Sequence, residues 1–150
     1  MYAARVPDKE PIGLLIGAAR RQIKRMVTER VRTHDLTAQQ FWVLVNIEEA
    51  GGPSLGEIAA RLRMDAPTAS RAVGQLLKRA LVKAEGDRAD RRRLRLKLTS
   101  AGRARLVPLR ELAAELRTAP VEGFSREEEE TLRALLRKVI SNMEAIIEGR

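Results

Sequence analysis

The sequence contains no cysteine and only one histidine. Disulfide frameworks, thiolate metal sites and thiol nucleophiles are therefore excluded, and a histidine-based metal cluster or catalytic relay is not expected. Aromatic residues make up only 3% of the chain, which disfavours the stacking platforms that hold single-stranded nucleic acids. We expect no catalytic residue, no metal site and no cofactor.

Long apolar runs are also absent. The longest stretch without a charged residue, 36–47, has 12 residues, whereas about 18 to 20 are needed to cross a bilayer. The first ten residues include Asp8 and Glu10 and lack the apolar core of a secretion signal. With 150 residues, the length of one ordinary domain, we expect a cytoplasmic protein with no membrane partner.

What the chain has in excess is positive charge. Its 29 Lys and Arg residues outnumber 20 Asp and Glu residues, which gives a net charge of +9. Between Ser54 and Arg105 there are 14 basic and 5 acidic residues, whereas the rest of the chain has 15 of each sign. An excess confined to one third of a chain is typical of a surface that binds a polyanion.

Apolar spacing and capping residues predict a mainly α protein with six helices and one small β-hairpin. Thr37, Ser54 and Ser125 are predicted N-caps, and the fifth helix is expected to bend near Pro108. The predicted helices are 12–31, 37–50, 54–62, 65–80, 99–116 and 125–147.

The third and fourth predicted helices are short and are joined by a turn at 63–65, which is typical of a helix-turn-helix. In the third helix Leu55 is expected to be buried. The inner stripe of the fourth is predicted to comprise Ala69, Val73, Leu76 and Ala80. Its opposite, exposed face is predicted to carry Thr68, Arg71, Gln75 and Lys78.

A hairpin with a charged tip follows. The apolar segment 81–84 and the alternating segment 94–98 are predicted strands, and residues 85–93 between them form the tip. A hairpin in this position is the wing of a winged helix-turn-helix. Asp87 and Asp90 can hold an arginine of the tip extended by charge-assisted pairing, and a guanidinium fits the minor groove of A·T-rich DNA.

Double-stranded DNA is therefore the expected partner. The start of the fourth helix can offer backbone N–H groups and hydroxyls to phosphates and an arginine to guanine, and Arg79 near its end is expected to meet phosphate or water. Predicted contacts on this helix are Thr68, Ser70, Arg71, Gln75 and Lys78. Those in the hairpin are Arg88, Asp90, Arg91, Arg92 and Arg93.

The terminal helices predict a homodimer. The apolar stripe of the last helix is two residues wide and wider than one packing partner requires. We expect residues 1–35 and 106–150 to form the dimer frame around a DNA-binding lobe at 36–105. The apolar positions of the last helix are Leu132, Leu135, Leu136, Val139, Ile140, Met143, Ile146 and Ile147.

A small aromatic or anionic effector is a possible further partner. Its predicted contacts, at the junction of the first, second and fifth helices, are Arg21, His34, Trp42 and Arg110. A lone histidine beside a helix cap is more often surface structure, and a lone tryptophan is more often part of a core. These ordinary interpretations of His34 and Trp42 stay open beside the ligand hypothesis.

The stretch Leu36–Val107 resembles the MarR family of dimeric winged-helix regulators. The resemblance lies in LTAQQFWVL at 36–44, LGEIAARL at 55–62, PTASRAVGQLLKRALV at 67–82 and DRADRRRLRLKLTSAGR at 87–103. It implies a triangular dimer, a pseudo-palindromic operator, and repression that a small ligand relieves. It also implies that Arg92 enters the minor groove, that Asp90 positions it, and that Thr68, Ser70 and Arg71 contact DNA.

Two residues depart from the family pattern. Gly74 stands where many members have an acidic residue that ties the recognition helix to the wing, so this brace is either absent or supplied by Asp87 or Asp90. Ala80 replaces a usual glycine after the fourth helix, so the turn must avoid a positive φ or tolerate strain.

We expect a ligand-responsive repressor with half-sites about one helical turn apart. The alternative is a ligand-independent architectural DNA-binding protein, whereas a nuclease is disfavoured because Asp87 and Asp90 lie in an arginine-rich hairpin.

Overall fold

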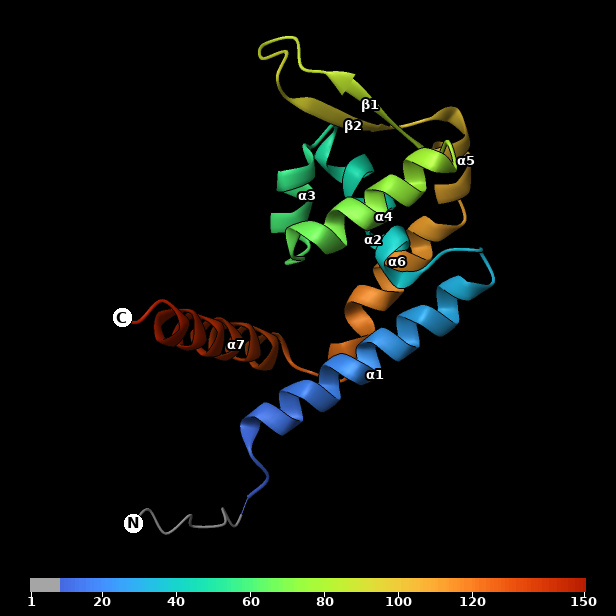
Figure 1. Cartoon of the computed structure of the whole chain (residues 1–150). Helices are drawn as coiled ribbons and strands as arrows, with labels where there is room; N and C mark the ends of the chain where they lie inside the picture. Colours follow the sequence, from blue (N-terminus) through green and yellow to red (C-terminus); the bar gives the residue numbers. More distant parts are fainter. Residues whose placement is uncertain (1–8) are drawn as a thin grey trace. The chain divides into compact units, whose positions relative to one another are not determined.

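The computed structural model describes residues 9–150, and residues 1–8, the start of the expected N-terminal segment, lie outside them. The described part confirms the expected class, a mainly helical chain with one antiparallel hairpin (Figure 1). Its elements are α1 (Ile12–Arg32), α2 (Ala38–Ala50), α3 (Leu55–Arg61), α4 (Ala66–Lys78), β1 (Val82–Gly86), β2 (Leu94–Leu98), α5 (Ser100–Leu106), α6 (Leu109–Thr118), a 3-10 helix η1 (Ala119–Val121) and α7 (Arg126–Ile147).

The predicted N-caps are confirmed. Thr37, Ser54 and Ser125 each accept a hydrogen bond from the backbone N–H three residues later. The side chain of the Gln or Glu at that position accepts one from the backbone N–H of the N-cap residue, which completes a capping box. Helix α2 ends as predicted at Gly51, whose φ of 68° lies in the left-handed region that glycine adopts without steric cost.

The predicted number of six helices is wrong, because residues 9–150 contain seven α-helices. The helix expected to run from Thr99 through Leu116 with a bend is two helices, α5 and α6, separated at Val107 and Pro108. Proline has no N–H to continue the helical ladder, and its ring collides with the preceding turn, so the chain starts a new helix there.

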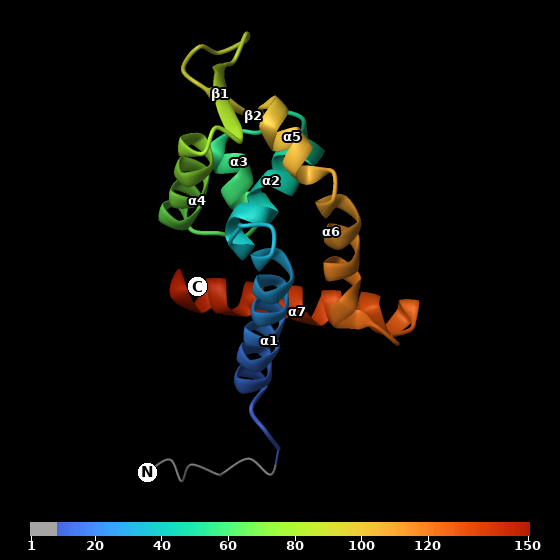
Figure 2. The same ribbon diagram turned by 90° about the vertical axis from the view of Figure 1, so that its right-hand side faces the viewer.

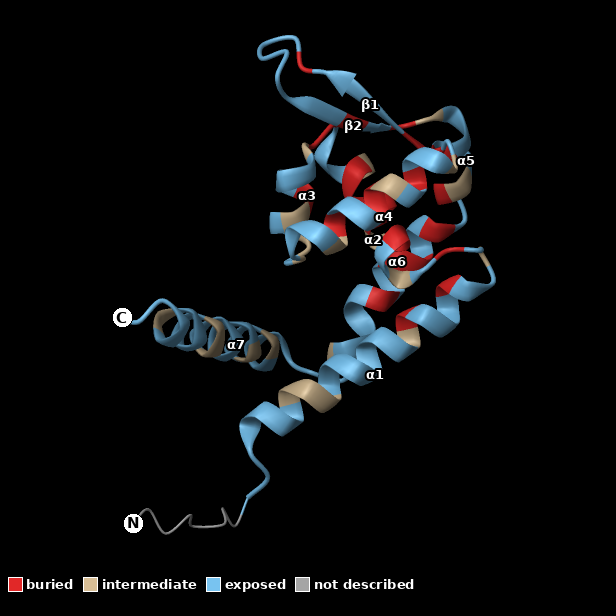
Figure 3. Ribbon diagram, in the orientation of Figure 1, coloured by how far each residue is buried: buried red, intermediate tan, exposed pale blue. Residues whose placement is uncertain are grey.

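Helix α2 lies at the centre of the core. Seven of its thirteen residues are buried, and Phe41, Leu44 and Ile47 are almost completely enclosed. Helix α2 packs against α3 and α4, in which Ile58 and Leu76 are also fully buried, and Figure 3 shows the buried residues in red. Burial of a side chain of this size contributes about 1.5–3 kcal/mol, so α2 is the element around which the helix-turn-helix assembles.

Two expected core residues are exposed. Leu55, in the first turn of α3, is 38% exposed. Ala80 lies outside helix α4 with a φ of 55°, because the N–H groups of Ala80 and Leu81 bond back to the carbonyls of Leu77 and Leu76 and end the helix. This closure is the Schellman motif, which normally places glycine at the left-handed position, so the chain tolerates the strain at Ala80.

The hairpin is a regular antiparallel pair. Val82 lies opposite Leu98 and Gly86 opposite Leu94 in the register of β1 and β2. Leu96 and Leu98 of β2 are buried, and the N–H of Leu96 donates to the carbonyl of Pro53 at 2.8 Å. The inner strand of the hairpin is therefore bound to the loop between α2 and α3, and this contact fixes the base from which the tip projects.

The chain divides into two compact units, 1–113, of which residues 9–113 are described, and 114–150. The second unit contains α7, none of whose residues is buried. In the first unit, α1 has only Val27 and Val31 buried, whereas Ile12 and Leu14 near its start are about 60% exposed. None of the helices in the described part of the chain is both long and apolar enough to span a bilayer.

Candidate nucleic-acid interface

The first turn of α4 presents a polar surface. Asp65 is its N-cap and accepts the N–H of Thr68 at 2.7 Å, and Pro67 occupies the first turn, as predicted. The hydroxyl and the amide of Thr68 together hold the pKa of Asp65 below its ordinary value. Thr68 is consequently half-buried and engaged at the cap, whereas Ser70 and Arg71 are exposed.

The last turns of α4 differ from the first, because two of their side chains are bonded to the rest of the lobe. Gln75 accepts a hydrogen bond from the side chain of Gln40 at 2.8 Å, and Arg79 at the C-cap donates to Asp35 and Gln40. Lys78 is exposed and makes no ion pair within residues 9–150. Ser70, Arg71, Gln75 and Lys78 are thus all exposed on α4, but Gln75 is bonded to Gln40 through its side chain.

Residues 87–93, which we call the hairpin tip, are shaped by two aspartates. The buried Asp87 accepts the N–H of Ala89 at 2.8 Å and Asp90 accepts the N–H of Arg92 at 3.0 Å. The N–H of Asp87 donates to the carbonyl of Arg93 at 2.9 Å and closes the loop. Asp90 thus fixes the backbone of Arg92 and not its guanidinium, so it positions this arginine without neutralising it.

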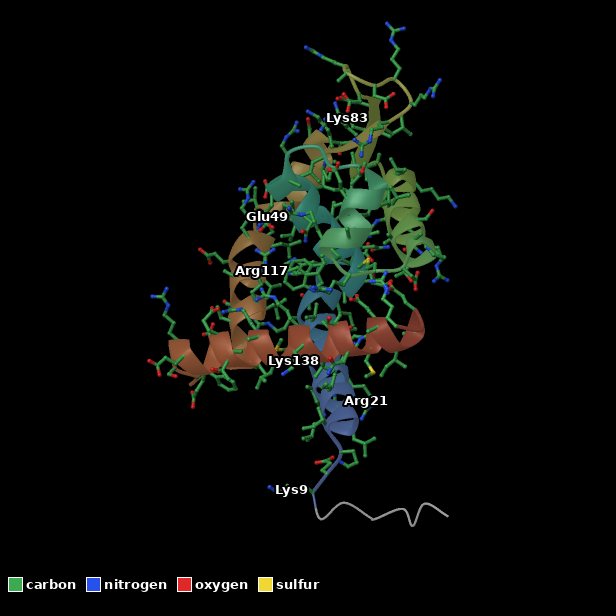
Figure 4. All side chains as sticks on the ribbon, turned by 90° about the vertical axis from the view of Figure 1, so that its left-hand side faces the viewer. Lys9, Arg21, Glu49, Lys83, Arg117 and Lys138 are labelled. Atoms are coloured by element: carbon green, nitrogen blue, oxygen red, sulfur yellow. The ribbon has the colours of Figure 1, made fainter. Side chains whose placement is uncertain are left out.

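Among the described residues, Arg91 and Arg92 make no side-chain hydrogen bond or ion pair. Figure 4 shows several long side chains ending in nitrogen that project from the tip beyond Lys83. Arg88 is exposed too, and its charge contributes, less than that of Lys83, to lowering the pKa of Glu85. The tip therefore presents the side chains of Arg88, Arg91 and Arg92 without hydrogen-bond or ion-pair partners among the described residues, together with the exposed Arg93, on a backbone that hydrogen bonds hold in place.

An arginine of β2 ties the tip end of the hairpin to the loop between α2 and α3. Arg95 donates to the carbonyl of Gly52 at 3.0 Å and pairs with Asp87 at 3.1 Å. The N–H of Ala89 and this guanidinium together keep the pKa of Asp87 below its ordinary value. At Gly74 of α4 an added Cβ would meet no atom within 4 Å.

Arg93, predicted as a hairpin contact for DNA, lies 3.7 Å from Glu57 of α3, and both side chains remain more than half exposed. An exposed ion pair at this distance contributes little to stability, so it does not prevent the Arg93 guanidinium from binding a partner.

Arg63, which the sequence interpretation did not select, is exposed in the turn before α4 with a φ of 50°. Its position in the turn of the helix-turn-helix is the sequence feature by which it could have been identified. The exposed cations of this surface are Arg63, Arg71, Lys78, Arg88, Arg91, Arg92 and Arg93.

Figure 2 shows that α4 forms one edge of the helical lobe and that the hairpin extends past its end. Helix and hairpin belong to the same compact unit, so the two sets of cations are held on one body. An exposed helix face beside a cationic hairpin can engage a major groove and the neighbouring minor groove or its phosphates.

Each of the four predicted effector residues has a different local environment. Arg21 is exposed on α1 (Figure 4), and His34 is half-buried with its carbonyl accepting from Arg105 at 2.8 Å. Trp42 is half-buried with its ring centroid 4.7 Å from that of Phe41. Arg110 pairs with Glu48, which raises the pKa of Arg110. Their joint role in binding a ligand stays a prediction.

An open pocket of about 200 Å³ lies behind the hairpin. None of the four predicted effector residues lines it, although Glu48 of its wall is the partner of Arg110. Its lining consists of Ile47, Glu48, Gly51, Gly52, Lys97, Leu98 and Arg103. Among residues 9–150, no three His, Asp or Glu side chains gather as metal ligands would.

A sequence model of the MarR family matches residues 34–93. A probable transcriptional regulator from Pseudomonas aeruginosa is 32% identical in sequence, with a TM-score of 0.69 over 87% of this chain and 97% of that one. A mutant of MarR from E. coli, complexed with operator DNA, is 28% identical, with a TM-score of 0.73 over 86% and 93% of the two chains. BpsR from Bordetella bronchiseptica, whose DNA binding is regulated by 6-hydroxynicotinic acid, is 28% identical, with a TM-score of 0.72 over 87% and 98%.

Proposed function

Because this chain belongs to the MarR family of DNA-binding transcriptional regulators, we propose that it is a homodimeric repressor of a pseudo-palindromic operator. The observation that carries the proposal is the hairpin tip, where Arg91 and Arg92 are exposed on a hydrogen-bonded backbone. An arginine on such a tip has no intramolecular hydrogen bond or ion pair to break before it enters a narrow, negatively charged minor groove. We place Ser70 and Arg71 of α4 in the adjoining major groove.

The apolar faces of the terminal helices support the dimer. A monomer rarely leaves contiguous apolar surface of this extent in water, and a second copy of the same helices covers it in the simplest symmetric way. On α1 the exposed positions are Ile12, Leu14, Leu15 and Ile23, and on α7 they are Leu135, Leu136, Met143, Ile146 and Ile147.

The dimer is tested by placing charge in this face. We expect the double substitution I146E/I147E to convert the protein from a dimer to a monomer in light scattering after gel filtration, because both side chains are at least two-thirds exposed in the single chain. The same substitutions should leave the helical content of the monomer unchanged. A variant that still elutes as a dimer would contradict the assignment of α7 to the interface.

Operator binding is tested with the hairpin. The preferred sequence is first selected from random duplexes, with half-sites expected about 34 Å apart, one helical turn. Arg92→Ala should then weaken binding to that sequence by about 1–3 kcal/mol at fixed salt. Arg126→Ala removes one exposed arginine from the first turn of α7 and serves as the matched control. Equal affinities of the Arg92 variant and the parent would show that the wing assignment is wrong.

Release by a small ligand is the finer part of the proposal, and it is supported by the similarity to BpsR. An aromatic acid that binds only the folded state raises its thermal stability by mass action. We propose Arg21, His34, Trp42 and Arg110 as its contacts. A thermal-shift screen of aromatic acids in which no compound raises the Tm would favour the alternative, an architectural protein without an effector. We assign the repressor to the cytoplasm, where its DNA target lies.

A further inference from the structure

The turn between α1 and α2 is held by two arginines from other helices. Arg79, at the end of α4, donates through Nη1 to the carbonyl of Asp35 at 2.7 Å. Arg105 of α5 donates through Nη1 to the preceding carbonyl, that of His34, at 2.8 Å. Asp35 has a φ of 54°, a conformation that a side-chain-bearing residue rarely adopts without fixed partners.

Arg79 makes two more bonds at the same place. Its Nη2 donates to Oδ2 of Asp35 at 3.0 Å and its Nη1 also reaches Oε1 of Gln40 at 3.2 Å. The side chain of Arg79 is only 28% exposed, whereas that of Asp35 is 92% exposed. The guanidinium therefore lies against the lobe, and the aspartate covers it from the solvent side.

Gln40 extends the network back to α4. It is buried, caps the first turn of α2 together with Thr37, and donates through Nε2 to Oε1 of Gln75 at 2.8 Å. Gln75 and Arg79 lie one turn apart on the same face of the helix. The C-terminal half of α4 is thus bound at two points to the end of α1 and the start of α2.

We propose that Arg79 is a positioning residue that fixes the recognition helix α4 relative to α1, with Asp35 and Gln40 as its acceptors, and that it does not contact DNA phosphate. This proposal rests on the proposed dimeric operator binding. Because α1 carries exposed apolar residues of the dimer face, the angle between α1 and α4 sets the distance between the two recognition helices. Arg79 is thereby a determinant of the half-site spacing that the dimer accepts.

The adjacent cation, Lys78, provides a matched comparison, since both residues lie at the end of α4 and each loses one charge on substitution by alanine. Affinity for duplex DNA depends on salt with a log-log slope of roughly −0.9 per phosphate contact. K78A should reduce the magnitude of this slope by about 0.9 for each protomer bound. R79A should leave the slope unchanged but lower the affinity for the selected operator by about 5- to 30-fold.

Arg79→Lys separates charge from geometry. Lysine keeps the positive charge but is a single point donor that cannot span two carbonyl or carboxylate oxygens and an amide in one plane. We expect R79K to behave as R79A does. We also expect both variants to discriminate several-fold less than the parent between the selected operator and one whose half-sites are moved by one base pair.

A slope that falls for R79A as it does for K78A, or full operator affinity of R79K, would overturn the proposal, because either result identifies Arg79 as a phosphate contact. Far-ultraviolet circular dichroism and the Tm of each variant establish that it is folded. If the parent itself shows no preferred half-site spacing, the dimeric operator proposal fails. The slope comparison on any duplex then still decides whether Arg79 meets phosphate.

Discussion

The tip and the root of the hairpin differ in which groups the fold holds in place. At the tip, residues 87–93, the fold fixes the backbone and leaves Arg91 and Arg92 without side-chain partners in the described structure. At the root, residues 80–82 and 98–102, hydrogen bonds join the two segments and their backbones lie in close contact. The hydroxyl of Thr99 donates to the carbonyl of Ala80 at 2.6 Å and its N–H to that of Leu81 at 3.1 Å.

The difference between tip and root shows that cations close together in the sequence have different roles in the fold. Seven of the 14 cations between Ser54 and Arg105 bond to other parts of the protein, among them Arg79, Arg95 and Arg105. Charge counted along the sequence therefore locates the DNA-facing region but overstates the number of cations that can reach phosphate. Substitutions at the root should act on stability, and those at the tip on binding.

The largest effect is expected at Gly102. A Cβ at this position would lie 2.0 Å from the carbonyl oxygen of Leu81, a backbone atom that cannot move without disturbing the root. Gly102→Ala should destabilise the protein by about 3 kcal/mol in urea unfolding. Gly74→Ala is the control, because its Cβ meets no atom and alanine favours a helix by about 0.5–1 kcal/mol. A neutral Gly102 variant would mean that the root is not close-packed.

Relief of strain at the root should give the next largest effect, of opposite sign. Ala80 has a φ of 55° at the end of α4. Ala80→Gly should stabilise the protein by about 0.5–1 kcal/mol, because the left-handed penalty of alanine exceeds the entropy that glycine adds to the unfolded chain. Chemical denaturation of the two proteins at equal concentration measures the difference. A loss of stability would indicate that the αL geometry does not persist in solution.

Acid should loosen the pairing of Asp87 with Arg95 at the tip end of the hairpin. The pKa of Asp87 is lower in the folded protein than in the unfolded chain, so its pairing with Ala89 and Arg95 stabilises the fold at pH values above the ordinary value of 3.8. This contribution is lost as the pH falls through the folded pKa. The parent should exceed Asp87→Asn in Tm at about pH 6, and the gap should narrow toward about pH 3. A gap independent of pH would show that the carboxylate charge plays no part.

The smallest effect on stability is expected at the tip. Arg91→Ala should change the free energy of unfolding by less than about 0.5 kcal/mol, because no side-chain contact is lost, and yet weaken DNA binding. Arg95→Ala should give the reverse, a lower Tm through the loss of its bonds to Asp87 and Gly52 and little change in the salt dependence of binding. If both variants lost only affinity, the separation of bonded cations from exposed ones would be wrong.

The hairpin also shows how far the sequence alone could go. Alternation in Leu94–Leu98 identified β2 and the charged stretch identified the tip, because side-chain period and composition are local properties. Glu57 and Gly52, which Arg93 and Arg95 contact, lie about 40 residues away in the sequence. No local pattern marks such partners, so the sequence could not show that Arg93 and Arg95 lie beside groups of the protein itself, and the DNA contacts of the tip arginines stay a prediction.

The sequence by itself determined the helix starts, the hairpin, the basic centre and the apolar terminal helices, since caps and periodicities act within a few residues of the chain. It did not determine that Arg79 turns back to Asp35, that Arg95 bonds to Gly52, or that Arg93 lies beside Glu57. These outcomes depend on which distant groups the packing brings together. Tertiary structure therefore decided which arginines remain free for DNA, because a guanidinium within reach of a carbonyl or carboxylate of its own chain is already bound.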